Sequence, residues 1–204
     1  KIQCHRFNTD GAFHLTRLQN EVVRTTHTQN LEHDDWVMYS GCDQFACIDD
    51  NMHDWLSRLN ENGSVNVVNS KLMSMFNTGE SHDTFDPVNT YFYGNIMSQP
   101  REFIHKYCDN YKYKADGLVM NNKNRCYFPG ITVNYGQTKS TEERRATFSR
   151  RKKAWSQGLP SSWGSHYKNG EARDWIWQKE KLLDIRESKY KNCITRLQEL
   201  NNKT

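Results

Sequence analysis

The chain has 204 residues, of which 35% are hydrophobic and 12% aromatic, as expected for one globular domain with a core rich in large rings. No apolar run approaches the roughly 18 residues of a membrane-spanning helix, so we expect no membrane span. The formal net charge of +4 is too small to indicate a nucleic-acid-binding protein, although it suits anionic ligands.

The six cysteines match no zinc-binding pattern, because there is no C-x-x-C pair and no histidine pair at finger spacing. A chain of this length does not need disulfide staples, so we expect mostly reduced thiols. No signal-peptide pattern opens the sequence, and we therefore expect a cytoplasmic protein.

The beginning of the sequence has the order strand, helix, strand. Residues 1–7 form a candidate strand, and Asp10 in the following turn can cap a helix. Apolar residues at helical spacing then predict a helix over about residues 12–31: Leu15, Leu18, Val22 and Val23. The apolar run Trp36–Tyr39 predicts the next strand, which gives the order of a parallel βαβ unit.

A second helix and strand follow. Helix caps are available at three consecutive positions, Asp49, Asp50 and Asn51. A short apolar helical face comes next, at Met52, Trp55, Leu56 and Leu59, and the pair Asn62-Gly63 ends it. Residues 65–68 predict a strand, and the polar, turn-rich residues 77–90 predict an exposed loop.

The later part of the chain changes character. Short apolar runs between residues 117 and 135 predict hairpin-like strands, as in a mixed sheet, and residues 140–157 predict a helix opened by a capping box. A last helix is predicted from about Glu171, because apolar residues recur every seven positions: Ile176, Leu183, Tyr190 and Leu197. We prefer one amphipathic helix packed on the domain, with a coiled-coil seam as the alternative.

The end of the Trp36–Tyr39 run is the most informative position. A lone carboxylate, Asp43, follows among small residues, and Gly41 allows the backbone to approach a ligand closely. In α/β domains ligands bind at the carboxyl ends of strands, and an aspartate there suits a hard divalent cation with its phosphates. The alternative is an ordinary turn, which Gly and Asp also favour.

The residues around Asp43 resemble the GT-A glycosyltransferases. The order is similar to the motif D-W-[apolar]-x-x-D-x-D-E-F, in which Asp35-Trp36, Asp43 and Phe45 match. Gly41 replaces the first acid of the motif, and Gln44 replaces its glutamate. The resemblance covers about residues 15–75, with a weaker echo at residues 164–167.

The resemblance implies an α/β fold: a single GT-A-like, Rossmann-related domain with a mixed, partly parallel central sheet flanked by helices, and a long C-terminal helix. The nucleotide and metal half would span about residues 1–75, and the acceptor half about residues 76–204. The implied activity is metal-dependent transfer of a sugar from a UDP-sugar to a glycan or glycoprotein acceptor. A viral capsid protein is one candidate acceptor, and the location would then be the host cytoplasm.

The resemblance also implies the binding residues. Mn²⁺ or Mg²⁺ would be held by Asp43, with His166 as a second ligand. The missing acid at Gly41 would weaken the metal site or shift that role to water or Asp49. The donor nucleotide would contact Arg17, Gln19, Asn20, Gly41 and Cys42. The alternative for His166 is a surface or packing histidine, and for the helix residues a solvated face.

A catalytic base would come from the loop after residue 77. Asp86 and Asp83 are the candidates, since a base must reach the acceptor hydroxyl within hydrogen-bond distance. The alternative for each is a solvated loop carboxylate.

Six cations occur on the predicted helix 141–157: Arg144, Arg145, Arg150, Arg151, Lys152 and Lys153. They could bind phosphate or nucleic acid. We prefer a solvated face partly balanced by Glu142 and Glu143, so nucleic acid is not the expected partner. A nucleic-acid-binding or nucleotide-processing protein, and a noncatalytic carbohydrate-binding module, are the competing function classes.

Overall fold

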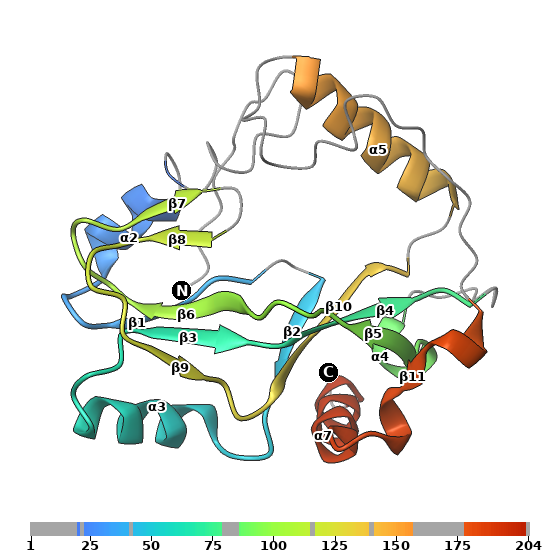
Figure 1. Ribbon diagram of the computed structural model, residues 1–204, viewed down its shortest axis with the longest axis horizontal. Coiled ribbons are helices and arrows are strands. Elements are labelled where there is room, and N and C mark those ends of the chain that lie inside the picture. The colour runs from blue at the N-terminus through green and yellow to red at the C-terminus, as the bar shows by residue number, and fades with distance from the viewer. Residues whose placement is uncertain are drawn as a thin grey trace. The chain divides into compact units, whose positions relative to one another are not determined.

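The computed structural model describes residues 20, 23–40, 43–78, 86–114, 117–138, 141–156 and 178–202 (Figure 1). The chain forms two compact units. The larger unit comprises Trp36–His105, Lys123–Ser140 and Trp175–Thr204, and it contains the two larger sheets. The smaller unit comprises Lys1–Asp35, Lys106–Asn122 and Thr141–Asp174, and its described residues include a two-stranded sheet and the helices α2 and α5.

A five-stranded mixed sheet lies in the larger unit, in the strand order β11-β5-β4-β10-β2. Its strands are β2 (Gln44–Cys47), β4 (Leu72–Phe76), β5 (Tyr93–Ile96), β10 (Ile131–Gln137) and β11 (Leu183–Asp184). β4 and β10 are parallel, whereas the other neighbouring pairs are antiparallel. This sheet confirms the prediction of an α/β fold with a mixed, partly parallel sheet.

A four-stranded sheet of the order β1-β6-β3-β9 completes the larger unit. Its strands are β1 (Trp36–Met38), β3 (Val67–Ser70), β6 (Arg101–Lys106) and β9 (Arg125–Tyr127), and β3 is antiparallel to β6 and parallel to β9. Hydrogen bonds join Tyr39 to Phe103 and Asp35 to Tyr107, so β1 and β6 run antiparallel. Within the described part of the chain β1 is an edge strand. Its predicted parallel partner, residues 1–7, lies outside the described residues.

Helices cover one face of each sheet (Figure 1). α7 (Lys191–Asn201) and the short α4 (Pro87–Thr90) pack on the five-stranded sheet, where Met73, Val133 and Ile194 are almost fully buried. α3 (Met52–Glu61) packs on the four-stranded sheet, and the rings of Trp55 and Phe128 meet edge to face with centroids 5.4 Å apart. Each sheet thus has its own apolar cluster.

α3 confirms the predicted helix and both of its ends. The side-chain oxygen of Asn51 accepts hydrogen bonds from the backbone N–H groups of His53 (2.9 Å) and Asp54 (3.4 Å). These bonds satisfy amides that a helix N-terminus otherwise leaves without partners. At the other end Asn62 caps the helix and Gly63 takes a φ of 67°, a left-handed conformation that favours glycine.

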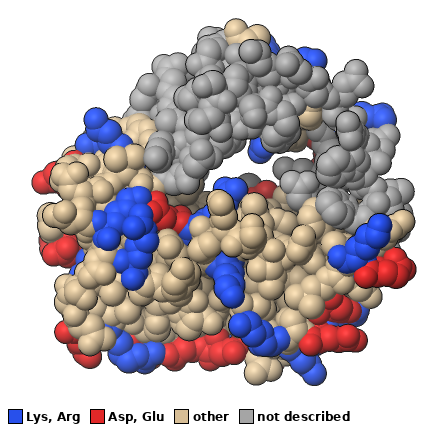
Figure 2. Space-filling view, in the orientation of Figure 1, with Lys and Arg blue, Asp and Glu red and all other residues tan. Residues whose placement is uncertain are grey.

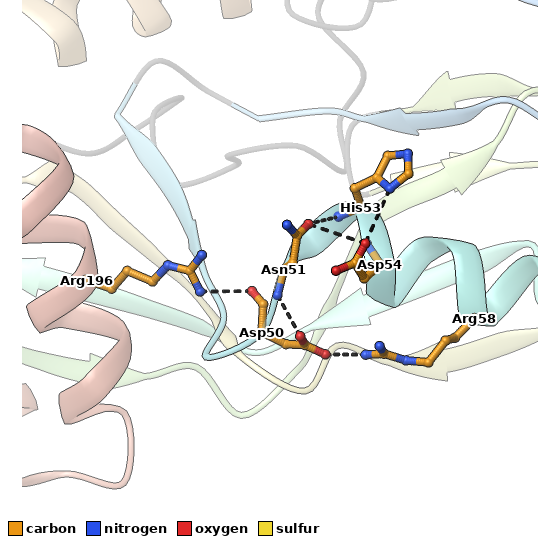
Figure 3. Close-up of polar contacts among 6 residues, drawn as sticks. All are labelled: Asp50, Asn51, His53, Asp54, Arg58 and Arg196. Atoms are coloured by element: carbon orange, nitrogen blue, oxygen red, sulfur yellow. Dashed lines mark hydrogen bonds and ion pairs between the residues drawn. The ribbon is translucent and has the colours of Figure 1, made fainter.

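The residue before the cap joins α3 to α7 (Figure 3). The carboxylate of Asp50 forms a hydrogen-bonded ion pair with Arg58, and the hydrogen bond from the guanidinium lowers the pKa of Asp50. The backbone carbonyl of Asp50 also accepts a hydrogen bond from Arg196 of α7 at 3.1 Å. Of the three predicted capping residues, Asn51 therefore caps α3, and Asp50 connects α3 to α7 through its contacts with Arg58 and Arg196.

The cap predicts the effect of a substitution. Asn51→Ala should lower the free energy of unfolding by about 1 kcal/mol, because two amides lose their acceptor. Asn51→Asp keeps a capping oxygen and should remain close to the native value. Urea denaturation of both variants measures the difference, and equal losses in the two would contradict the capping role.

The prediction of an exposed loop over residues 77–90 is wrong at its end. Pro87–Thr90 form α4, and Val88 is only 2% exposed in the core. Asp86 supports this turn, because its carboxylate accepts hydrogen bonds from the backbone N–H (3.4 Å) and side-chain amide (2.8 Å) of Asn89. Residues 79–85 lie outside the described residues.

The predicted long C-terminal helix is also wrong. Residues 178–190 form the 3₁₀ helix Lys179–Lys181, strand β11 and the 3₁₀ helix Ile185–Glu187, and helix begins only at Lys191. β11 pairs with β5, and the Asp184 carboxylate accepts the backbone N–H of Arg186 at 2.9 Å. These local bonds replace the helical ones. The part of the predicted helix before Gln178 lies outside the described residues.

The seven-residue spacing nevertheless marked core positions. Tyr190 is 6% exposed and Leu197 packs against the same cluster, whereas Leu183 is 40% exposed. Separate short elements that pack on one sheet can therefore imitate the apolar repeat of a single helix.

The smaller unit contains α2 (Arg24–Asn30), α5 (Thr141–Ser156) and the antiparallel pair β7 (Lys112–Lys114) and β8 (Gly117–Val119). α2 confirms the end of the helix predicted over residues 12–31, and α5 confirms the helix predicted over residues 140–157. Tyr111 is fully buried, and its ring meets those of Tyr107 (5.8 Å) and Tyr113 (5.4 Å) edge to face.

α2 contacts this group of tyrosines through His27. The Nδ1 atom of His27 lies 2.6 Å from the Tyr111 hydroxyl, and the Arg24 guanidinium lies 5.9 Å from the centre of the same ring. Burial raises the pKa of Tyr111 to about 12, so the hydroxyl stays protonated and can donate to a neutral imidazole. Burial lowers the pKa of His27 below its ordinary value of 6.5.

His27 should make stability depend on pH. Its pKa is lower in the folded chain than in the unfolded chain, so the unfolded chain binds the extra proton first as pH falls below about 6.5. The stabilisation is complete above that pH and declines below it. His27→Gln should therefore show a smaller loss of melting temperature than the native chain between pH 7.5 and pH 5. Parallel melting curves across this range would contradict the assignment.

The four cysteines within the described ranges, Cys47, Cys108, Cys126 and Cys193, carry free thiols. Burial raises the pKa of both Cys47 and Cys193 to about 12, so these two thiols are uncharged at neutral pH. They behave as core side chains. Cys4 and Cys42 lie outside the described residues.

Among the residues that the structure describes, every helix is too short or too polar to cross a membrane. Acidic and basic side chains are interspersed over the described surface on the face in view (Figure 2). The small positive charge of the sequence is therefore not gathered into one patch on that face.

Candidate functional site

Asp43 lies at the carboxyl edge of two parallel strands, but these are not the strand that the sequence predicted it to follow. It does not end β1; it directly precedes β2 in the other sheet. Since β2 runs antiparallel to β10, its first residue lies beside the end of β10, and the parallel β4 ends at the same edge. The backbone oxygen of Asp43 accepts the N–H of Tyr135 at 2.8 Å, which fixes this position.

The Asp43 side chain meets a glycine across the strand pair. A Cβ atom on Gly136 would lie 2.5 Å from the Asp43 Oδ2 atom and 2.9 Å from the Asn134 Oδ1 atom. Asn134 and Gly136 belong to an irregular part of β10, where the register with β4 shifts between Asn134 and Gln137. Bulges of this kind often re-aim side chains next to functional sites. Only a residue without a side chain leaves both oxygens where they are.

The Asp43 residue is half-buried, and no other described residue provides a partner for its carboxylate. Within the described part of the chain it accepts no hydrogen bond and forms no ion pair. An ionised carboxylate taken partly out of water is costly unless a donor or a cation faces it. The arrangement therefore suits a cation supplied from outside the protein.

Neutral polar residues form one row across three strands that includes Asn134. Gln44, Asn134 and Ser74 are in register across β2, β10 and β4. Val133, the residue before Asn134, belongs to the apolar cluster, so alternation along β10 places Asn134 on the other face of the sheet. The Ser40 hydroxyl donates to the backbone oxygen of Gln44 at 3.0 Å and ties down the chain on either side of Asp43.

Two other predicted site residues have structural contacts. Asp86 caps α4, and its charge adds to the effect of burial in raising the pKa of Tyr135. Asn20 belongs to the smaller unit, where its side chain pairs with both backbone groups of Tyr113, at 2.7 and 3.0 Å. The catalytic role of Asp86 and the nucleotide contact of Asn20 stay predictions. The remaining candidates lie outside the described residues: Arg17, Gln19, Gly41, Cys42, Asp83 and His166.

Asn134 and Gly136 were not among the predicted site residues. Both stand at the end of the predicted strand that contains Val133 and Tyr135. The rule that singled out Asp43, a polar residue and a glycine at the end of an apolar run, applies equally to Asn134-Tyr135-Gly136. What the sequence lacked was the pairing of β2 with β10.

The described residues contain no group of three or more His, Cys, Asp or Glu side chains that could hold a metal ion. A cation at Asp43 would therefore need neutral oxygens, water or residues outside the described ranges as further ligands. Mn²⁺ and Mg²⁺ accept such sets, since they take oxygen ligands and retain several waters.

The cations of α5 do not form one binding face. At 3.6 residues per turn, Arg145, Arg150 and Arg151 project roughly a third of a turn apart around the helix axis. This distribution favours a solvated helix, as predicted from the sequence.

Comparison with known proteins found no match to this chain among family models, curated proteins or solved structures.

Proposed function

We propose that this chain is a metal-dependent glycosyltransferase that moves a sugar from a UDP-sugar donor to a glycan or glycoprotein acceptor. One observation carries the proposal: the carboxylate of the half-buried Asp43, at the carboxyl edge of β4 and β10, has no donor or cation facing it from the described residues. The resemblance of residues 15–75 to the GT-A enzymes supports the choice of a nucleotide-sugar as substrate.

The residues around Asp43 fit a hard divalent cation. Asp43 would hold it, and the absent side chain of Gly136 leaves the approach to the Oδ2 atom open. When bound, the cation supplies positive charge to offset the negative charge that develops on the departing diphosphate.

The chain's own residues orient this carboxylate. The bond from the Tyr135 N–H fixes the Asp43 backbone, and the bond from Ser40 to Gln44 holds the segment on both sides. Gln44 and Ser74 present neutral amide and hydroxyl groups in the adjacent row, which suits a ligand rich in hydroxyl groups. Asp86 and Asp83 are the proposed sources of the base, and His166 is a proposed second metal ligand.

A screen of nucleotide sugars tests the function. The chain should release nucleoside diphosphate from a UDP-sugar in the presence of Mn²⁺, and EDTA should stop the release. If the screen shows release from no nucleotide sugar with any divalent cation, the proposal fails. Glycan binding unaffected by EDTA would then favour a noncatalytic carbohydrate-binding module. Nucleic-acid affinity that falls steeply with salt would favour a nucleic-acid-binding protein that uses the cations of α5.

A further inference from the structure

Two oxygen atoms from different parts of the chain converge on Gly136. The Asp43 Oδ2 atom comes from the residue just before β2, and the Asn134 Oδ1 atom comes from β10. They lie 2.5 and 2.9 Å from the point that a Cβ atom of Gly136 would occupy. A side chain at position 136 would displace both, so the glycine allows the two oxygens to share this space.

The orientation of the Asn134 amide is fixed by a hydrogen bond. The backbone N–H of Gly136 donates to the Oδ1 atom at 2.6 Å, so the oxygen, and not the NH₂ group, lies on this side. A carbonyl oxygen has two lone pairs, and this bond uses one of them. One acceptor site on Asn134 therefore remains next to a carboxylate that can only accept.

Two acceptors held close together repel each other unless a donor or a cation lies between them. No donor from the described residues reaches the Asp43 carboxylate. A divalent cation would both separate the two acceptors and supply the partner that the carboxylate needs, since carboxylate and side-chain carbonyl oxygens are ligands that hard cations take from proteins.

We propose that the Oδ1 atom of Asn134 is the second protein ligand of the divalent cation held by Asp43. This inference rests on the proposed function. It assigns a ligand in addition to the predicted His166, and it explains how the site tolerates Gly41 in place of an acid. One charged and one neutral ligand leave more positive charge on the cation than two carboxylates would, so UDP should strengthen Mn²⁺ binding.

Direct measurement of Mn²⁺ binding tests this role without depending on activity. The electron paramagnetic resonance signal of free Mn²⁺ is titrated with the full chain, with and without UDP. Asn134→Ala should weaken Mn²⁺ binding at least about tenfold, whereas Asn134→Asp keeps the oxygen and should bind at least as tightly as the native chain. Asn95→Ala is the matched control, because Asn95 is exposed and in register with Asn134 but lies two strands away.

A variant at Gly136 adds an independent readout. Gly136→Ala should weaken Mn²⁺ binding as Asn134→Ala does. The fold should survive, because the added Cβ meets the ends of side chains and not backbone. Native Mn²⁺ affinity in a folded Asn134→Ala chain, together with lost affinity in Asp43→Ala, would overturn the ligand role of Asn134 and leave the proposed function intact. If the native chain binds no Mn²⁺ with or without UDP, both proposals fail.

Discussion

Replacing Asp43 with alanine is expected to reduce the proposed Mn²⁺-dependent release of UDP by about a hundredfold or more. The reason is that charge stabilisation by a metal at a departing phosphate contributes several kcal/mol to the rate. The measurement is the initial rate of UDP release at saturating Mn²⁺, on the sugar that the native chain uses. Unchanged release by the variant would remove Asp43 from the reaction.

The loss should be one of function and not of folding. The Asp43 carboxylate has no compensating partner within the described residues, so its removal costs no hydrogen bond or ion pair that the structure shows. A melting temperature close to the native value is therefore expected for Asp43→Ala in the absence of ligands. Asp54→Ala is the matched control, since this carboxylate is exposed on α3 in the same unit, and it should keep native activity.

Replacing Gly130 with alanine is expected to destabilise the chain more than any other substitution considered above. An added Cβ atom would overlap the backbone carbonyl oxygen of Cys47, and the carbonyl carbon would be 2.8 Å away. Backbone atoms cannot move aside as a side chain can, so β2 and β10 would have to separate at the pair Ile131 and Cys47. We expect a loss of at least about 3 kcal/mol in the free energy of unfolding.

Thermal and urea denaturation measure this effect, which corresponds to roughly 6–12 °C in melting temperature for a chain of this size. Gly136→Ala, near the end of β10, is the control and should melt within a few degrees of the native chain. Equal melting temperatures for Gly130→Ala and the native chain would show that the two strands do not approach as closely as described.

Local features of the fold could be predicted because they depend on neighbouring residues. The cap at Asn51 and the stop at Gly63 follow from side chains within four positions of one another, and α5 occupies the residues predicted for it. The C-terminal segment shows the limit of this reasoning. Its seven-residue spacing marked Tyr190 and Leu197 as core residues, but local bonds of Asp184 and the pairing of β11 with β5 keep residues 183–187 out of the helix, which begins only at Lys191.

The site was predictable only in part for the same reason. A lone aspartate among small residues pointed to Asp43, and the structure describes it at a carboxyl strand edge. Its neighbours Asn134 and Gly136 come from a distant part of the sequence and reach it only because β2 pairs with β10. No periodicity in either strand determines that partner. The proximity of Asn134 and Gly136 to Asp43 depends on this long-range strand pairing, so only the structure could reveal it.

The most direct test of the Asp43 site is the melting temperature of the native chain and of Asp43→Asn with UDP, with Mn²⁺, and with both. A ligand at a hundred times its dissociation constant stabilises the folded state by about 2.7 kcal/mol, or roughly 5–10 °C here. We expect a shift of that size for the native chain with UDP and Mn²⁺ together, and none for Asp43→Asn. No shift in the native chain, or the same shift in both, would contradict it.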